Sequence, residues 1–270
     1  MDFSVLMSLY DKDNEDYLVQ SIESLLNQTV LANEIVLVID GPINQKLQNI
    51  VNFYSIRYKD LFKIIQLPEN MGLGKALDQG IFHCTNEYVA RMDADDISLP
   101  NRFEKQVEFI EKNPDIDIFG AIIDEFNENG EVVSTRTVPL TDKEIKKYIR
   151  RRSPFNHPTV FFKKSKVILF GGYGNLGRKQ DYDLFSRMLM NDCKGANLNE
   201  SLLLFRSDNN SFKRRKSIKN AKSYVRVARN NYSRGYCSLN DLVFVICSQI
   251  LAVILPIWVF KIITKKFLRK

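Results

Sequence analysis

The chain has 270 residues, of which 44% are hydrophobic, so it can bury a substantial core and is not an intrinsically disordered protein. Its four cysteines form no C-x-x-C pair, and neither histidine has a zinc-like spacing with them. We therefore expect reduced thiols and no structural zinc. No secretory signal precedes the first predicted strand, which favours a cytosolic setting.

The formal charge of +7 is divided unevenly along the chain. Residues 209–270 contain 14 Lys and Arg and one acid, Asp241, whereas residues 1–208 contain 25 basic and 31 acidic residues. An acidic body argues against nucleic-acid binding, because a nucleic-acid-binding body carries its own basic face. The basic tail alone is expected to meet an anionic partner, although its first half also reads as a solvated linker.

Extended apolar segments alternate with amphipathic ones through the first 95 residues. The predicted strands are residues 3–9, 34–39 and 62–66, and the predicted helices are residues 15–27 and 45–58. Nearly continuous apolar strands are typical of parallel sheets covered on both faces. The sequence thus predicts an α/β fold with a Rossmann-like, mostly parallel sheet and helices on both faces.

Three carboxylates follow the predicted strand at residues 88–92, at Asp93, Asp95 and Asp96. In open α/β sheets, ligands bind beyond the carboxyl ends of the strands, where Asp40 is also expected. Oxygen-rich sites of this kind suit Mg²⁺ or Mn²⁺ shared with a diphosphate. The alternative is an acidic turn that opens the next helix, and Asp96 is expected to cap that helix.

A glycine-containing loop at residues 68–75 precedes a helix through residues 76–82. Its glycines allow backbone amides to approach a ligand, and Lys75 supplies positive charge. The Walker A spacing is absent, and an ordinary strand-to-helix turn is the alternative reading.

The next predicted elements are a helix at residues 100–112 and a strand at residues 116–123, followed by a hairpin at Asn129-Gly130. A strand at residues 158–162, a loop at residues 171–174 and a helix at residues 180–190 complete the body.

Eight motifs occur in an order that resembles bacterial family-2 glycosyltransferases of the GT-A fold, over residues 1–208. They are residues 4–10, 21–29, 34–41, 70–77, 91–96, 156–160, 171–173 and 180–184. The resemblance implies inverting transfer of a sugar from a nucleoside diphosphate sugar, in particular a UDP-sugar, to an acceptor hydroxyl. It also implies Mn²⁺ or Mg²⁺ as the cofactor.

The same resemblance implies roles for individual residues at the donor site. Asp40 would contact the nucleoside with Tyr10 nearby, and Asn70 and Lys75 would lie along the donor. Asp95 would hold the metal ion, with Asp93 at the ribose or in the water shell of the metal.

On the acceptor side, Asp181 would take the proton of the acceptor hydroxyl. The family's common Glu-Asp pair is here Gln180-Asp181. Asp181 as a helix cap is the alternative. His157 would contact the acceptor or a phosphate, or would serve as a structural hydrogen-bonding group.

The C-terminal part is expected to divide into a basic helical or linker segment at residues 209–238 and a membrane-associating segment at residues 239–270. Residues 242–260 form a run of nineteen without charge, followed by a basic end. We expect an interfacial or re-entrant helix that bends at Pro256 and lies on anionic lipid headgroups. A single span and a helix packed on protein are the alternatives.

This placement predicts a peripheral or monotopic protein on the cytoplasmic face of the cell inner membrane. It also predicts a lipid-linked acceptor, such as a polyprenyl diphosphate oligosaccharide in O-antigen, capsule or exopolysaccharide synthesis. The competing hypotheses are a sugar nucleotidyltransferase, which lacks support because its glycine-rich loop is absent after the first strand, and a catalytically inactive membrane-anchored binding protein of the same fold.

Overall fold

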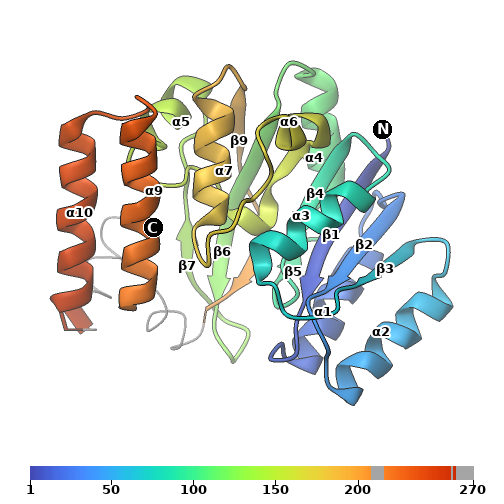
Figure 1. Ribbon diagram of the computed structural model, residues 1–270. Helices are drawn as coiled ribbons and strands as arrows, with labels where there is room; N and C mark the ends of the chain where they lie inside the picture. Colours follow the sequence, from blue (N-terminus) through green and yellow to red (C-terminus); the bar gives the residue numbers. More distant parts are fainter. Residues whose placement is uncertain (208–215, 257, 260–270) are drawn as a thin grey trace.

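The strands of the computed structural model form one mixed sheet (Figure 1). They are β1 (Phe3–Leu9), β2 (Glu34–Ile39), β3 (Phe62–Gln66), β4 (Tyr88–Met92), β5 (Ile97–Ser98), β6 (Ile118–Phe126), β7 (Val132–Arg136), β8 (Phe161–Lys163) and β9 (Gly195–Arg206). Their order is β3-β2-β1-β4-β8-β6-β9-β5, with β7 paired to β6. The structure describes residues 1–207, 216–256 and 258–259.

Helices cover both faces of this sheet. They are α1 (Glu15–Leu26), α2 (Gln45–Arg57), α3 (Leu73–His83), α4 (Arg102–Lys112), α5 (Asp142–Tyr148), α6 (Lys164–Leu169), α7 (Gln180–Leu189), α9 (Ile218–Ser233) and α10 (Leu239–Ile254), with the 3₁₀ helix η1 at His157–Thr159. Helices α1, α2 and α4 pack on one face, and α3, α5, α6 and α7 pack on the other.

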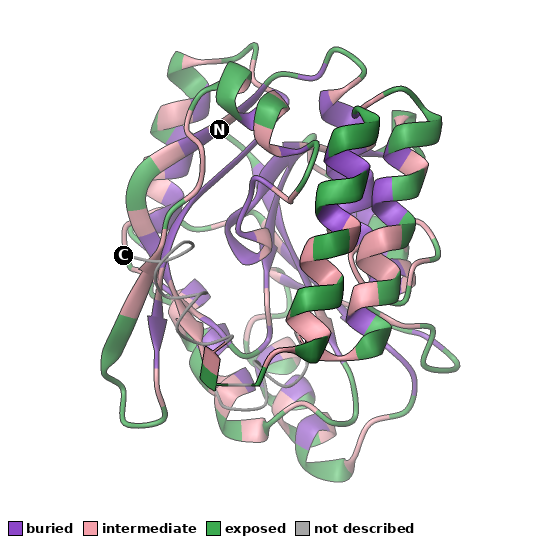
Figure 2. Cartoon of the chain, turned by 90° about the vertical axis from the view of Figure 1, so that its left-hand side faces the viewer, coloured by how far each residue is buried: buried purple, intermediate pink, exposed green. Residues whose placement is uncertain are grey.

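The apolar strands are buried on both sides because alternate residues face different helix layers. In β1, Val5 and Met7 belong to the core under α1, α2 and α4, whereas Leu6 belongs to the core under α3 and α7. Figure 2 shows these central strands as buried and the outer helix surfaces as exposed. The predicted α/β fold, with a parallel half formed by β1 to β4, is confirmed.

Several elements differ from the sequence-based expectations. The segment expected as a strand at residues 158–162 begins as η1, and β8 starts only at Phe161. Helices α5 and α6 and strands β5 and β9 were not predicted; β9 contains the polar stretch Asn197–Ser201, which breaks its apolar pattern. The hairpin at Asn129-Gly130 is confirmed, and Gly130 has a φ of 80° that favours glycine.

The strand register brings the predicted donor-site segments to one edge of the sheet. Leu9 at the end of β1 pairs with Ile39 at the end of β2, and Ile39 pairs with Gln66 at the end of β3. Met7 pairs with Met92, the last residue of β4. The loops that follow these four strands therefore share the carboxyl edge of the parallel half.

The C-terminal part forms a hairpin of α9 and α10 beside the body (Figure 1). Helix α10 starts at a capping box made by Ser238 and Asp241 and ends at Ile254. The bend expected at Pro256 is therefore a helix end, because the residue before a proline disfavours helical backbone. Among the described residues, no helix combines the length and apolar character needed to cross a bilayer. The basic end at residues 261–270 lies outside them.

Candidate active site

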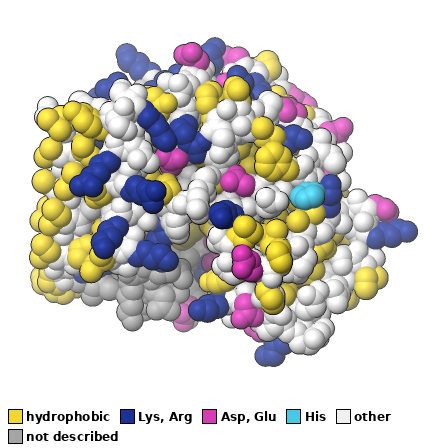
Figure 3. Space-filling model, viewed as in Figure 1, with side chains coloured by type: hydrophobic (Ala, Val, Ile, Leu, Met, Phe, Trp, Pro, Cys, Tyr) yellow, Lys and Arg dark blue, Asp and Glu magenta, His cyan; other side chains and the backbone are white. Residues whose placement is uncertain are grey.

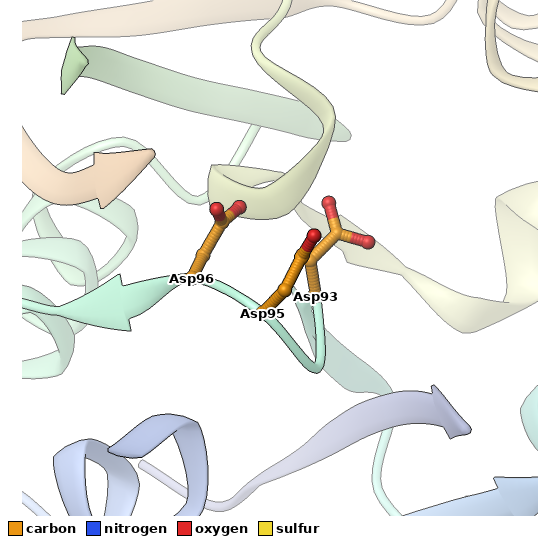
Figure 4. A group of neighbouring side chains, drawn as sticks. All are labelled: Asp93, Asp95 and Asp96. Carbon is orange, nitrogen blue, oxygen red and sulfur yellow. The ribbon is translucent and has the colours of Figure 1, made fainter. Parts of the chain in front are cut away.

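Three carboxylates gather in the loop after β4. Asp93, Asp95 and Asp96 each place one carboxylate oxygen within 4.8 Å of the others. Figure 4 shows the three side chains pointing to the same side of the loop. Asp95 is exposed, Asp93 is partly buried and Asp96 is fully buried. Such an oxygen-only set fits a hard divalent cation.

Asp96 does not cap the following helix, so that expectation is wrong. Helix α4 begins at Arg102, and the Oδ1 atom of Asp96 instead accepts a hydrogen bond from the backbone N–H of Arg206 at 2.9 Å. Its Oδ2 atom has no hydrogen-bond partner in the described part of the chain. Burial, reinforced by Asp95 and Asp93, raises the pKa of Asp96 well above its usual range. A buried unpartnered carboxylate oxygen fits a site made for a cation.

Arg206, the last residue of β9, ties the acidic loop to the sheet. Its Nε atom donates to the carbonyl of Asp95 at 2.9 Å, in addition to its backbone bond to Asp96. The guanidinium lies 3.7 Å from the ring centre of Tyr17 and 4.5 Å from that of Phe126. The loop geometry thus depends on a strand that the sequence did not predict.

A fully buried arginine in β4 faces the cluster. The Nη1 atom of Arg91 forms an ion pair with Asp93. The Nε and Nη2 atoms of Arg91 make no hydrogen bond to any described residue. The ion pair orients the carboxylate of Asp93, the first acid of the cluster. The sequence analysis missed this role, although a charged residue inside an apolar strand was a signal for it.

A second buried arginine links the acidic loop to the turn at η1. Arg102 donates from Nη2 to the carbonyl of Arg91 at 2.7 Å and from Nε to Gln106 at 3.0 Å. Gln106 in turn donates to the carbonyl of Thr159 at 2.7 Å. Burial, together with the nearby charge of Arg91, lowers the pKa of Arg102 to about 9. This network fixes the end of β4 relative to His157.

Asp13 is a further acid near the cluster. Its Oδ2 atom accepts a hydrogen bond from the backbone N–H of Tyr10 at 2.9 Å. Burial, with repulsion from Asp95 and Asp93, raises the pKa of Asp13 to about 7. The N-cap of α1 is the next residue, Asn14, so Asp13 does not cap that helix.

The Asp40 carboxylate shapes the loop before α3. Its oxygens accept hydrogen bonds from the backbone N–H groups of Met71 at 2.7 Å and Gly72 at 2.9 Å. The amide of Asn70 donates to the carbonyl of Asp40 at 3.2 Å. The structure thus brings Asp40, which is 5% exposed, and Asn70 together, and Lys75 follows in the first turn of α3.

His157 contacts a buried tyrosine from the glycine loop. Its Nε2 atom lies 3.0 Å from the hydroxyl of Tyr173. Burial, with a smaller effect of Arg91, lowers the pKa of His157 well below its usual range, so the ring is neutral. The backbone N–H of Tyr173 donates to Asp78 of α3 at 2.6 Å, which fixes the glycine loop against that helix.

One large cavity is lined by a carboxylate of the predicted donor side and by residues of the predicted acceptor side. It has a volume of about 1370 Å³, and Asp93, His157 and Asp181 all line it. Asp181 is the second residue of α7 and lies in its first turn. Asp95 does not line this cavity, although its carboxylate lies close to that of Asp93, and Tyr10, Asp40, Asn70 and Lys75 also lie outside its lining. Asp93 of the acid cluster and the separate carboxylate of Asp181 therefore share one space.

The chain is similar to known glycosyltransferases. The family model "Glycosyl transferase family 2" matches residues 4–183. The UDP-Gal:alpha-D-GlcNAc-diphosphoundecaprenol beta-1,3-galactosyltransferase of Escherichia coli is 36% identical over 98% of each chain. The amylovoran biosynthesis glycosyltransferase AmsE of Erwinia amylovora is 40% identical over 84% of each chain.

A solved structure shows the same fold. The mannosyltransferase PcManGT of Pyrobaculum calidifontis, in complex with GDP-Man and Mn²⁺, superimposes with a TM-score of 0.65 at 13% identity, over 96% of this chain and 72% of that one. The match to the family model, together with the GT-A architecture, confirms the resemblance read from the motifs. The chain belongs to glycosyltransferase family 2.

Proposed function

We propose that the protein transfers a sugar from a UDP-sugar to a hydroxyl of a polyprenyl diphosphate-linked glycan, with inversion at the anomeric carbon. The observation that carries this proposal is the cavity shared by Asp93 of the acid cluster and Asp181. The donor and acceptor classes are supported by the name of the Escherichia coli relative, which matches over 98% of this chain. The family match favours glycosyl transfer over nucleotidyl transfer.

The donor diphosphate would be held at the carboxyl edge of the sheet with Mn²⁺ or Mg²⁺. Asp95 and Asp93 would hold the metal ion, and the Mn²⁺ in the structural relative supports this choice. When bound, such an ion stabilises the negative charge of the departing diphosphate as a Lewis acid. Asp40 would bind the nucleoside together with Tyr10, and Asn70 would lie along the donor. The hydrogen bonds of Asp40 to residues 70–72 hold the loop that leads to Lys75.

Asp181 would act as the general base. A sugar hydroxyl is a weak nucleophile until a carboxylate accepts its proton. Attack from the side opposite the leaving diphosphate gives inversion, which requires the base and the acid cluster on different sides of one space. Asp181 on α7 and Asp93 after β4 line the same cavity from different elements. His157 would orient the acceptor through its neutral ring.

The α9–α10 hairpin would place this site at the cytoplasmic face of the inner membrane. Helix α10 exposes apolar side chains, with exposed fractions of 51% at Ile250, 56% at Leu251 and 72% at Ile254. Figure 3 shows this apolar edge beside Lys and Arg side chains of α9. An apolar strip next to cations suits an anionic bilayer surface.

The test is UDP release by the purified protein from a panel of UDP-sugars with Mn²⁺. We expect Asp95→Asn to lower kcat/KM about a hundredfold or more, because charge stabilisation of the leaving group is lost. Asp181→Asn should keep UDP binding and lose transfer. The control is Asp115→Asn, since Asp115 is an exposed carboxylate that pairs with Lys194 away from the cavity.

Absence of metal-dependent UDP-sugar turnover by the wild-type protein would overturn the proposal and favour an inactive binding protein. If Asp115→Asn lowered kcat/KM as much as Asp95→Asn does, the assignment of metal binding to the acid cluster would be contradicted.

A further inference from the structure

The cavity that contains Asp93 and Asp181 continues past the site toward the C-terminal hairpin. Beyond those carboxylates, its wall is formed by the turn that follows α5, and then by α10. Four cations of α5 and this turn line it: Lys147, Arg150, Arg151 and Arg152. Neither the donor chemistry nor the general base uses them.

The turn that carries these arginines is fixed by the fold. The backbone N–H groups of Arg151 and Arg152 both donate to the carbonyl of Tyr148, at 3.1 Å each. Ile149, which follows Tyr148 in this turn, is fully buried in the core under α7. Because these backbone hydrogen bonds and the buried Ile149 fix the turn, the backbone positions of its three arginines are fixed relative to one another.

The four cations differ in their partners. Arg151 is satisfied, because its Nε atom lies 2.5 Å from Asp241 and its guanidinium lies 4.6 Å from the ring centre of Phe244. In the described part of the chain, Lys147, Arg150 and Arg152 form no ion pair. Three cations without an acidic partner among the described residues therefore line the cavity.

Glu144 of α5 also lines the cavity, but in the described part of the chain it forms no ion pair with these cations. The carboxylate of Glu144 accepts hydrogen bonds from the backbone N–H and the hydroxyl of Thr141, at 3.1 Å and 2.9 Å, as part of the capping box of α5. Unpaired cations that are held together repel one another unless an anion joins them. Their placement fits a ligand with more than one negative charge.

The part of the cavity wall that α10 forms is mixed in character. Phe244 and Ala252 contribute apolar surface beside the polar side chains of Asn240, Ser248 and Gln249, and the Phe244 ring lies against the guanidinium of the paired Arg151. The same cavity thus presents carboxylates, cations and some apolar surface. A ligand that fits this lining carries a hydroxyl, a polyanionic group and hydrocarbon.

We infer that Lys147, Arg150 and Arg152 bind the diphosphate of the lipid-linked acceptor, and that α10 receives the start of its hydrocarbon chain. This inference rests on the proposed function and names the part of the site that selects the acceptor. The donor diphosphate is assigned to the acid cluster, which contains none of these cations, so the two diphosphates would occupy separate positions. Arginine and lysine groups are well suited to phosphate oxygens.

The experiment is a calorimetric titration of the full-length protein with farnesyl diphosphate, at saturating UDP and Mn²⁺ so that the donor position is filled. Farnesol and inorganic diphosphate serve as comparison ligands. We expect binding of farnesyl diphosphate to exceed that of either comparison ligand. The double substitution Arg150→Gln and Arg152→Gln should raise its Kd about tenfold or more, since hydrogen bonds to a charged ligand are lost.

The matched control is Lys143→Gln. Lys143 is an exposed cation of the same helix α5 but does not line the cavity. This variant should bind farnesyl diphosphate as the wild type does, and both variants should keep the wild-type Kd for UDP.

Two results overturn the inference while leaving the proposed function intact. One is UDP binding without farnesyl diphosphate binding; the other is an equal Kd for farnesyl diphosphate in the wild type and the double variant. Binding of farnesol as tight as that of farnesyl diphosphate also overturns it, because the cations would then contribute nothing. If the wild type fails to bind UDP with Mn²⁺, the proposed function fails first and this inference fails with it.

Discussion

Arg151 reaches from the turn after α5 to Asp241 in the first turn of α10, with 2.5 Å between its Nε atom and the carboxylate Oδ1 atom. The same carboxylate caps α10 by accepting hydrogen bonds from the hydroxyl and backbone N–H of Ser238, at 2.8 Å and 3.1 Å. Burial opposes ionisation, but the hydrogen bonds from Ser238 and Arg151 outweigh it and lower the pKa of Asp241. The Asp241 side chain thus stabilises the first turn of α10 and also links this helix to Arg151 in the cavity wall.

Asp241→Ala should destabilise the attachment of α10. Loss of a helix cap together with a partly exposed ion pair is expected to cost about 1–2 kcal/mol. Hydrogen exchange should show faster exchange in residues 239–254, with no change in β1 to β4. Exchange that rises equally throughout the sheet would contradict a local role. Glu108→Ala, which removes an exposed ion pair with Lys112, is the control.

Arg91→Met tests the orientation of Asp93. Asp93 loses its buried partner, while its own carboxylate remains 27% exposed and can be hydrated. We expect a loss of about 1–3 kcal/mol in unfolding free energy and a larger fractional loss of metal-dependent turnover. Urea unfolding and UDP release measure the two effects. Unchanged turnover in a folded variant would show that Arg91 serves only the core.

The raised pKa of Asp13 predicts a pH-dependent cost in the metal-free protein. The folded state raises the pKa from the ordinary value of 3.8 to about 7, so it binds the proton more tightly than the unfolded state. The cost of ionising Asp13 is therefore small near pH 4 and complete above about pH 7. Asp13→Asn removes it and should stabilise the protein by about 1–3 kcal/mol at about pH 8, after discounting for partial exposure.

Unfolding of both proteins with chelator, at several pH values, measures this effect. The stability gap between Asp13→Asn and the wild type should widen from about pH 5 to about pH 8. A gap that stays constant or narrows with rising pH would contradict the raised pKa of Asp13.

Gly172 is expected to be intolerant of a side chain. Its φ is 63°, and an added Cβ atom would collide with the carboxylate of Asp78. Gly172→Ala should cost about 1–3 kcal/mol and disturb the loop that carries Tyr173. Gly130 is a close match, with a φ of 80° and nothing within 4 Å of an added Cβ atom. Thermal unfolding should show a smaller loss for Gly130→Ala, and equal losses would argue against the collision.

The exposed side of α10 predicts attachment to anionic membranes. The double substitution Ile250→Glu and Ile254→Glu places two charges on that apolar strip and should weaken binding to phosphatidylglycerol-containing vesicles about tenfold or more. Co-sedimentation measures binding. Ile56→Glu on α2, at a side chain that is 77% exposed, should bind vesicles like the wild type. Equal binding by all three proteins would exclude α10 as the contact.

Local sequence determined the parallel half of the sheet and the positions of its functional loops. Apolar runs of strand length alternating with amphipathic segments specify β1 to β4, and acids directly after such strands, as at Asp93, must lie at the carboxyl edge. The hairpin at Asn129-Gly130 is likewise local, because the turn conformation depends on that glycine.

Only the tertiary structure decided which distant groups meet. The role of Asp96 depends on Arg206, 110 residues later, and the cationic wall of the cavity depends on α5, which carries a short apolar face that local pattern did not reveal. In the sequence, Arg91 is only a charged residue within an apolar strand. The folded structure shows that it is buried and forms an ion pair with Asp93. Spacing specifies backbone direction within one element, whereas the charge environment of a site arises from elements that pack together only in the folded chain.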